Sequence, residues 1–208
     1  MPSKVVKLVT NEVYHVYNRG VDKRVTFTDK KDYLRFYQSL ALFNTQEPAV
    51  NFDFANTRFK NNFESKKLVE IQAYSLLPNH FHLIIKQCVD GGISEFMRRV
   101  ATGYTSYFNQ RVERSGVLFQ GVFKRVHIET QEQYQYLLAY VNENHFVHNI
   151  DMIREICHSS SLHYQKLATS KLIDSTSVDF YSFEDSLLLA KDIYIRRENE
   201  KNLKSTLE

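Results

Sequence analysis

The segment LVEIQAYSLLPNHFHLIIK, residues 68–86, has the pattern of an antiparallel β-hairpin. Two runs rich in branched and aromatic residues, 68–77 and 80–86, are typical of strands. Between them stands Pro78-Asn79, a dipeptide that favours a tight turn. We therefore predict two antiparallel strands joined by a short turn.

The second of these strands carries a His-Phe-His pattern. Because side chains alternate between the two faces of a strand, His80 and His82 point the same way, and Phe81, Leu83 and Ile85 point to the opposite, helix-covered face. Two neutral imidazoles about 7 Å apart along one strand can converge on a divalent cation. The same spacing also fits two exposed strand histidines, so both interpretations stay open at this point.

Patterns of other strands and helices flank the hairpin. Runs of β-formers predict strands, and apolar residues three and four apart predict helices. Asp29 and Thr130 are suitable N-caps, the latter with Gln133 as in a capping box. The predicted elements are a strand over 12–18, a helix over 29–43, a polar loop or insertion over 44–67, a helix over 93–112, an extended segment over 117–128 and a helix over 131–145.

The predicted order β-α-β-β-α-β-α indicates the α+β class. We expect residues 1–150 to form one domain, an antiparallel sheet with helices on one face. Residues 151–208 differ, because the serines at 159–161 are followed by helical stretches with a highly charged end. These residues predict a small helical C-terminal extension.

Composition excludes several classes of protein. The chain has 208 residues, of which 43% are hydrophobic and 25% charged, which is ordinary for a globular protein. Cys88 and Cys157 lie far apart, so neither a disulfide framework nor a CxxC metal site is expected. No run of 18 apolar residues is present, so we expect no membrane partner and a cytoplasmic location.

The net charge of +3 is modest, but the positive charge is concentrated. Six Arg and Lys residues face a single acidic residue, Glu113, between residues 98 and 125, and aromatic residues such as Tyr104 and Phe123 lie among them. Such a composition suits a groove that binds phosphates and stacks unpaired bases. It also fits a solvated helix face over a core.

A tyrosine and an asparagine share one face of the last predicted helix. Tyr140 and Asn144 are four residues apart, so a phenol and an amide oxygen lie close together. Spacing alone does not single out Tyr140, since Tyr134 and Tyr136 lie in the same helix and the chain has 13 tyrosines.

Four short segments resemble, in the right order, the HUH single-tyrosine transposases of bacterial insertion sequences, and most closely their branch associated with repetitive extragenic palindromes (REP). Two departures stand within the last segment: Asn142 replaces the usual His, and His145 replaces the usual Pro. The segments are YHVYNRG at 14–20, LPNHFHL at 77–83, GVLFQGVFK at 116–124 and YVNENH at 140–145.

This resemblance implies a ferredoxin-like, RRM-like fold and a strand-transfer reaction. Tyr140 would attack a phosphodiester in single-stranded DNA that bears hairpins, forming a 5′-phosphotyrosine link. His80, His82 and Asn144 would hold one Mg²⁺ or Mn²⁺. Residues expected to contact DNA, from the resemblance and from their charge, are Arg19, Arg98, Arg99, Phe119, Gln120, Lys124 and Arg125.

Several alternatives stay open. The protein is either a strand transferase, a non-catalytic DNA-binding relative, or a metal-dependent nuclease that uses water in place of Tyr140. The active site is built either within one chain or by exchange of a helix across a homodimer. His145 and His148 have His-x-x-His spacing, although a solvated helix end explains them equally well. His15 is expected to be a sheet histidine with a structural role.

Overall fold

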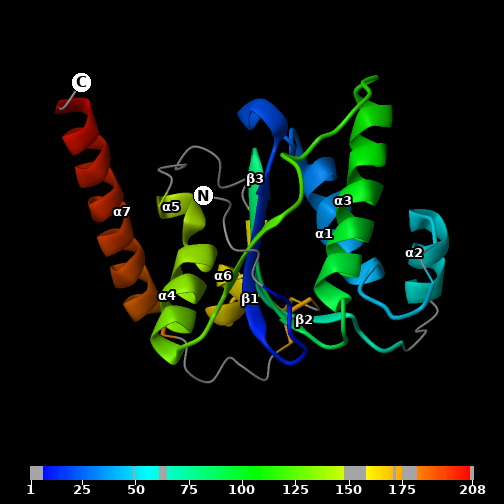
Figure 1. Cartoon of the computed structure of the whole chain (residues 1–208), viewed down its shortest axis with the longest axis horizontal. Helices are drawn as coiled ribbons and strands as arrows, with labels where there is room; N and C mark the ends of the chain where they lie inside the picture. The colour runs from blue at the N-terminus through cyan, green and yellow to red at the C-terminus, as the bar shows by residue number, and fades with distance from the viewer. Residues whose placement is uncertain are drawn as a thin grey trace.

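A five-stranded antiparallel sheet, in the order β4-β1-β3-β2-β5, forms the centre of the computed structural model (Figure 1). The predicted hairpin is its core, with Leu77 opposite His80 across the Pro78-Asn79 turn. The structure describes residues 7–48, 50–60, 65–147, 158–170, 172–174 and 182–206. The strands are β1 (Val13–Arg19), β2 (Val69–Leu77), β3 (His80–Gln87), β4 (Lys124–His127) and β5 (His158–Ser159).

Most helices begin where the sequence predicts. The Asp29 carboxylate accepts hydrogen bonds from the backbone N–H groups of Lys31 and Asp32, and the Thr130 hydroxyl accepts one from Gln133 N–H, so both predicted N-caps are confirmed. The helical elements are η1 (Val21–Lys23), α1 (Lys30–Leu42), α2 (Phe52–Lys60), α3 (Gly92–Arg111), α4 (Gln131–Asn142), α5 (Asn144–Val147), α6 (Ser161–Tyr164) and α7 (Phe183–Thr206).

Two predicted segments differ from the structure. The polar segment 44–67, predicted as a loop, contains α2, which is held by the Arg35 guanidinium 3.2 Å above the ring of Phe52. The segment 117–128, predicted as extended, pairs as a strand only at Lys124–His127. Its first part turns at Gly121, whose φ of 65° is left-handed and incompatible with a strand.

Helices α1 and α3 cover one face of the sheet, as predicted (Figure 1). Phe81, Leu83 and Ile85 of β3 are all fully buried against them. This confirms the α+β class and the strand alternation expected around the two histidines.

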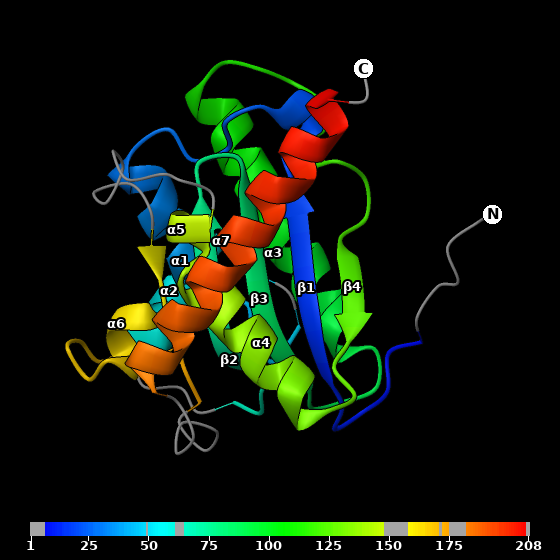
Figure 2. The same cartoon turned by 90° about the vertical axis from the view of Figure 1, so that its left-hand side faces the viewer.

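The prediction that helices cover one face is incomplete, because α4 packs on the opposite face (Figure 2). The reason is that this face carries apolar side chains besides its histidines: Ala73 and Ile84 are buried against Leu138 and Val141 of α4. Helix α7 then packs on the outer side of α4. The sheet is therefore sandwiched between two helical layers.

The described part of the C-terminal extension contains helices, as predicted, and adds a strand to the sheet. β5 pairs with Ser75 and Leu76 at the edge of β2, and the Tyr164 hydroxyl donates a hydrogen bond to Gln72 O. The predicted boundary at residue 150 and Cys157 lie outside the described residues. No helix in the described ranges is long and apolar enough to cross a bilayer.

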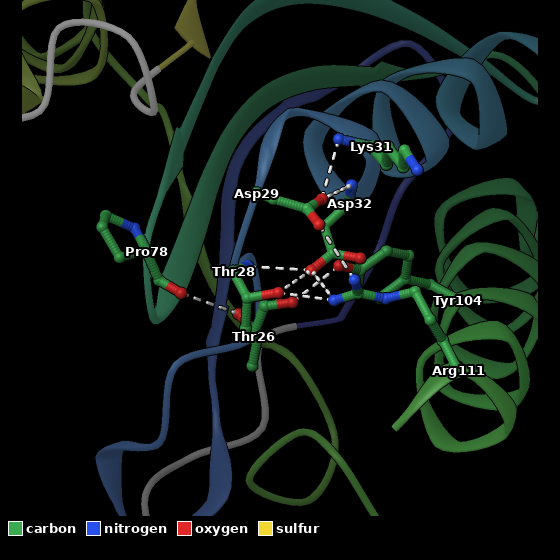
Figure 3. A network of polar contacts seen from close by, with 8 residues as sticks. All are labelled: Thr26, Thr28, Asp29, Lys31, Asp32, Pro78, Tyr104 and Arg111. Carbon is green, nitrogen blue, oxygen red and sulfur yellow. Dashed lines mark hydrogen bonds and ion pairs between the residues drawn. The ribbon is translucent and has the colours of Figure 1, made fainter. Parts of the chain in front are cut away.

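A buried ion pair ties α1 to the end of α3 (Figure 3). The fully buried carboxylate of Asp32 accepts hydrogen bonds from Arg111 Nη2, at 2.6 Å, and from the backbone and hydroxyl of Thr28. One turn nearer the sheet, Tyr104 Oη donates to Thr26 O, and Thr26 N–H donates to Pro78 O. The network thus reaches the turn that directly precedes His80.

Candidate active site

Three of the sequence motifs meet at one end of the sheet. Backbone hydrogen bonds join Gly20 N–H to Asn79 O at 2.9 Å and Gln120 N–H to Arg19 O at 2.7 Å. Gly20 is required here, because a Cβ atom at this position would lie 2.3 Å from Arg24 O. Backbone bonds therefore hold the Asn-Arg-Gly turn, the hairpin turn and the Leu-Phe-Gln segment together around one site.

A cavity of about 240 Å³ opens at this junction. It combines a phenol, two imidazoles, an amide and two cationic side chains from four separate parts of the sequence. Of the residues predicted for the site it brings together Arg19, His80, His82, Gln120, Lys124 and Tyr140, and Tyr17 and Asn18 complete the lining.

Tyr140 reaches this cavity from α4, above the histidine face of the sheet. Its ring lies edge-on to His82, with centroids 5.4 Å apart and an interplanar angle of 89°. Its other neighbours are the two apolar clusters that hold α4 between the sheet and α7. The spacing argument that left Tyr134 and Tyr136 open is thereby resolved in favour of Tyr140, since neither of the others lines the cavity.

Both histidines of the His-x-His pattern are held through their Nδ1 atoms. His80 Nδ1 lies 2.6 Å from Asn79 Oδ1, and His82 Nδ1 lies 2.8 Å from Nε2 of His15. His15 is buried, and loss of solvation lowers its pKa to about 4, so its ring is neutral at pH 7. The two rings that would face an ion are thus fixed in orientation by neighbours behind them.

Asn144 directly follows α4, and its position is less direct than predicted. The helix predicted over 131–145 is interrupted at Glu143, and Asn144 begins α5. Its amide Nδ2 donates to Tyr140 O at 3.2 Å, and the residue does not line the cavity. Its buried Oδ1 has no hydrogen-bond partner among the described residues. A buried acceptor of this kind fits a ligand oxygen.

The donor set suits a hard divalent cation that also binds phosphate. Two neutral imidazoles and one amide oxygen carry no charge, so an ion held by them would retain positions for anionic oxygen. Among the described residues no cluster of three His, Cys, Asp or Glu side chains could hold a metal. A His-His-Asn set lies outside that definition. His145 lies in α5, and His148 lies outside the described residues.

Asn142, which replaces the histidine usual in the resembled family, has a structural contact. Its buried Oδ1 accepts a hydrogen bond from Ser160 Oγ, and the neighbouring Glu143 carboxylate accepts one from Ser161 Oγ. Ser160 Oγ also accepts from Tyr74 N–H on β2. The serine-rich patch therefore anchors the end of α4, and with it Tyr140, to the sheet of the same chain.

The basic segment 98–125 is mostly engaged within the protein. The Arg99 side chain is only 9% exposed and bonds to Glu95, Thr45 O and Glu47 O. Arg98 forms a two-pronged pair with Glu95 at 2.7 Å but keeps 59% of its side chain exposed. The structure thus gives Arg99 a structural role and no access to DNA.

Two further predicted DNA contacts lie away from the cavity. Phe119 is 6% exposed and packs among Phe36, Phe81 and Tyr104, so it belongs to the core and not to a stacking surface. Arg125 lies beside the ring of Phe123 in a separate hollow between β4 and α3. Strand alternation explains this, because Lys124 and Arg125 point to opposite faces of β4.

Sequence reasoning missed the residues that support the histidines. Tyr17 lies opposite His82 in the β1–β3 ladder, and His15 lies on the same face two residues earlier. Alternation along β1 would have placed both on the histidine face once the pairing of β1 with β3 was known. Asn79 and Asn18 carried no signal beyond their places in turns.

An antiparallel sheet that presents two histidines from one strand beneath a helical tyrosine is the arrangement expected of the single-tyrosine transposases. Comparisons with known proteins agree. Residues 53–144 match the family described as "Transposase IS200 like". A solved structure described as a REP-associated tyrosine transposase bound to a REP hairpin has a similar fold, with a TM-score of 0.57 and 13% identity over 88% of this chain and 96% of that chain. No curated protein matches the sequence. The family match and the shared fold confirm the predicted resemblance to IS200-like, REP-associated tyrosine transposases.

Proposed function

We propose that this protein cleaves and rejoins single-stranded DNA through a covalent bond between Tyr140 and a 5′ phosphate. The observation that carries the proposal is the meeting of Tyr140, His80 and His82 in one cavity. A nucleophile, a pair of metal-ligand side chains and a cationic rim are the parts that phosphoryl transfer requires.

The reaction follows from the position of the phenol. Tyr140 Oη attacks the phosphorus, the bond from phosphorus to O3′ breaks, and the 3′ oxygen leaves as a hydroxyl after taking up a proton. The phenol proton is released to solvent. Because the new phosphotyrosine bond resembles the phosphodiester that was broken, a 3′ hydroxyl can reverse the step without ATP.

His80, His82 and Asn144 would hold one Mg²⁺ or Mn²⁺, consistent with the orphaned Oδ1 of Asn144. Such an ion, when bound, polarises a phosphoryl oxygen and neutralises developing charge. Lys124 and Arg19 at the rim attract the phosphate and orient it toward Tyr140.

Hairpin-bearing DNA is the proposed substrate. The similar solved protein is bound to a REP hairpin, and this chain shares its fold over most of its length. The cavity lies at an open end of the sheet, and the exposed Lys124 and Gln120 extend its rim outward. A single strand leaving a hairpin can therefore enter it.

A covalent-adduct assay tests the proposal. The full chain is incubated with 3′-labelled single-stranded oligonucleotides that carry hairpins, with Mn²⁺ or with EDTA, and separated on a denaturing gel. We expect a slower band that requires the metal and is lost in Tyr140→Phe. Tyr136→Phe is the matched control, because this tyrosine lies one turn earlier on α4 and is 41% exposed.

Other outcomes would redirect the proposal. Cleavage that survives Tyr140→Phe without a slower band would establish a nuclease that uses water. Tight hairpin binding without any product, for the protein with Mn²⁺, would establish a non-catalytic DNA-binding protein.

A further inference from the structure

The two histidines of the active site each have a dedicated neighbour behind them. His80 Nδ1 lies 2.6 Å from Asn79 Oδ1, and His82 Nδ1 lies 2.8 Å from His15 Nε2. Both contacts involve the nitrogen nearer the backbone. For each ring the nitrogen that can approach an ion is therefore Nε2.

The proton on His80 is assigned by the orientation of the Asn79 amide. Asn79 Nδ2 donates to Lys23 O at 3.1 Å, and a carbonyl oxygen can only accept, so Asn79 Oδ1 is the atom that faces His80. A carboxamide oxygen also only accepts. His80 Nδ1 must therefore carry the proton, and Nε2 carries the lone pair that a metal requires.

The contact between His15 and His82 contains one proton shared between two ring nitrogens. If His82 Nδ1 carries it, Nε2 of His82 has a lone pair for a cation. If His15 Nε2 carries it, His82 Nε2 is an N–H group that repels a cation. The rings are nearly parallel, with an interplanar angle of 15°, and Tyr17 stacks against both, so the contact has little freedom to rearrange.

We propose that His15 and Asn79 are positioning residues that hold His82 and His80 as Nδ1–H tautomers and so direct both Nε2 atoms toward one divalent cation. This rests on the metal role given above to the two histidines. His15 is suited to the task, because it is buried on β1 and fixed by the β1–β3 ladder. Asn79 is fixed on both sides, by Lys23 O and by Gly20 N–H. Such outer-shell hydrogen bonds change metal affinity by roughly 10- to 100-fold in other proteins.

Metal affinity of matched variants tests the role of His15. Binding of Mn²⁺ to the full chain without DNA is followed by the loss of the free-ion paramagnetic resonance signal. His15→Leu removes the acceptor, and we expect its dissociation constant to rise at least about tenfold. His15→Gln keeps an acceptor oxygen near the position of Nε2, and we expect it to stay within about threefold of the unmodified chain. Equal affinity in all three proteins, or equal loss in both variants, would overturn the proposal.

Nuclear magnetic resonance of the unmodified protein gives a second test that does not depend on a variant folding. Long-range ¹H–¹⁵N spectra of ¹⁵N-histidine-labelled protein report the tautomer of each ring. We expect Nδ1–H for both His80 and His82, and an Nε2–H tautomer for either would refute the inference for that residue. Should the unmodified protein show these tautomers yet bind no Mn²⁺, the metal role within the proposed function would fail while the tautomer assignment stands.

Discussion

The rings of Tyr140 and His82 stand perpendicular, with centroids 5.4 Å apart, and both belong to one chain. The proposed nucleophile and a proposed metal ligand therefore meet without a second copy of the protein. Asn142 and Glu143 at the end of α4 are bonded to Ser160 and Ser161, which fixes the helix on its own sheet. A helix exchanged across a dimer would have to give up these buried contacts.

Complementation between inactive variants tests this arrangement. Tyr140→Phe and His82→Ala are each expected to be inactive in the adduct assay. Because the two residues act in the same chain, an equimolar mixture unfolded and refolded together should stay inactive. In a helix-exchanged dimer the mixture would form sites with both native residues, so recovered activity would contradict the one-chain site.

The salt dependence of DNA binding distinguishes two cations that the sequence treats alike. Lys124 lines the cavity, whereas Arg98 is neutralised by its two-pronged pair with Glu95, which holds the pKa of that carboxyl down at about 2. We expect Lys124→Gln to lower the slope of log K against log salt by about 0.7, the value for one phosphate contact on a single strand. Arg98→Gln should leave the slope nearly unchanged. Fluorescence anisotropy with a labelled oligonucleotide at several salt concentrations measures both, and a reversed order would contradict the geometry.

The features that follow local rules were predictable from the sequence. Alternation along β3 places Phe81 in the core and His82 on the opposite face, and Asp29 caps α1 because its side chain reaches the first free N–H groups. The likeness of four short motifs to one family located Tyr140 among neighbouring tyrosines. These features depend on residues only a few positions apart.

Features that depend on distant pairing were not predictable. Arg99 is engaged by carbonyl groups of Thr45 and Glu47, which lie more than fifty residues earlier. Phe119 belongs to a motif that also contains cavity residues, and nothing in its spacing shows that it points into the core. The packing of α4 on the histidine face depends on Ala73 and Ile84 of two separate strands. Each of these outcomes is fixed by tertiary contacts and not by local pattern.

The ion pair between Asp32 and Arg111 is expected to be a large contributor to stability. Removal of Arg111 leaves the fully buried carboxylate of Asp32 without its counter-ion (Figure 3). We expect Arg111→Gln to lower the free energy of unfolding by about 3 kcal/mol, as for a broken buried pair. Arg98→Gln, which breaks an exposed pair, should cost no more than about 1 kcal/mol. Urea denaturation followed by circular dichroism measures both, and equal effects would show that burial of Asp32 does not matter.

The buried ring of His15 predicts how stability changes with pH. Its pKa of about 4 in the folded protein lies below the value of 6.5 expected when the chain is unfolded, because burial disfavours the charged ring. Between these values the unfolded state binds a proton that the folded state does not. The free energy of unfolding should therefore fall as the pH is lowered from about 6.5 to 4, by about 3 kcal/mol in total. Urea denaturation in EDTA at several pH values measures this slope without a bound ion. His15→Gln has no titrating ring at this position, so its slope should be shallower by that amount, whereas an unchanged slope would assign the loss of stability to other groups.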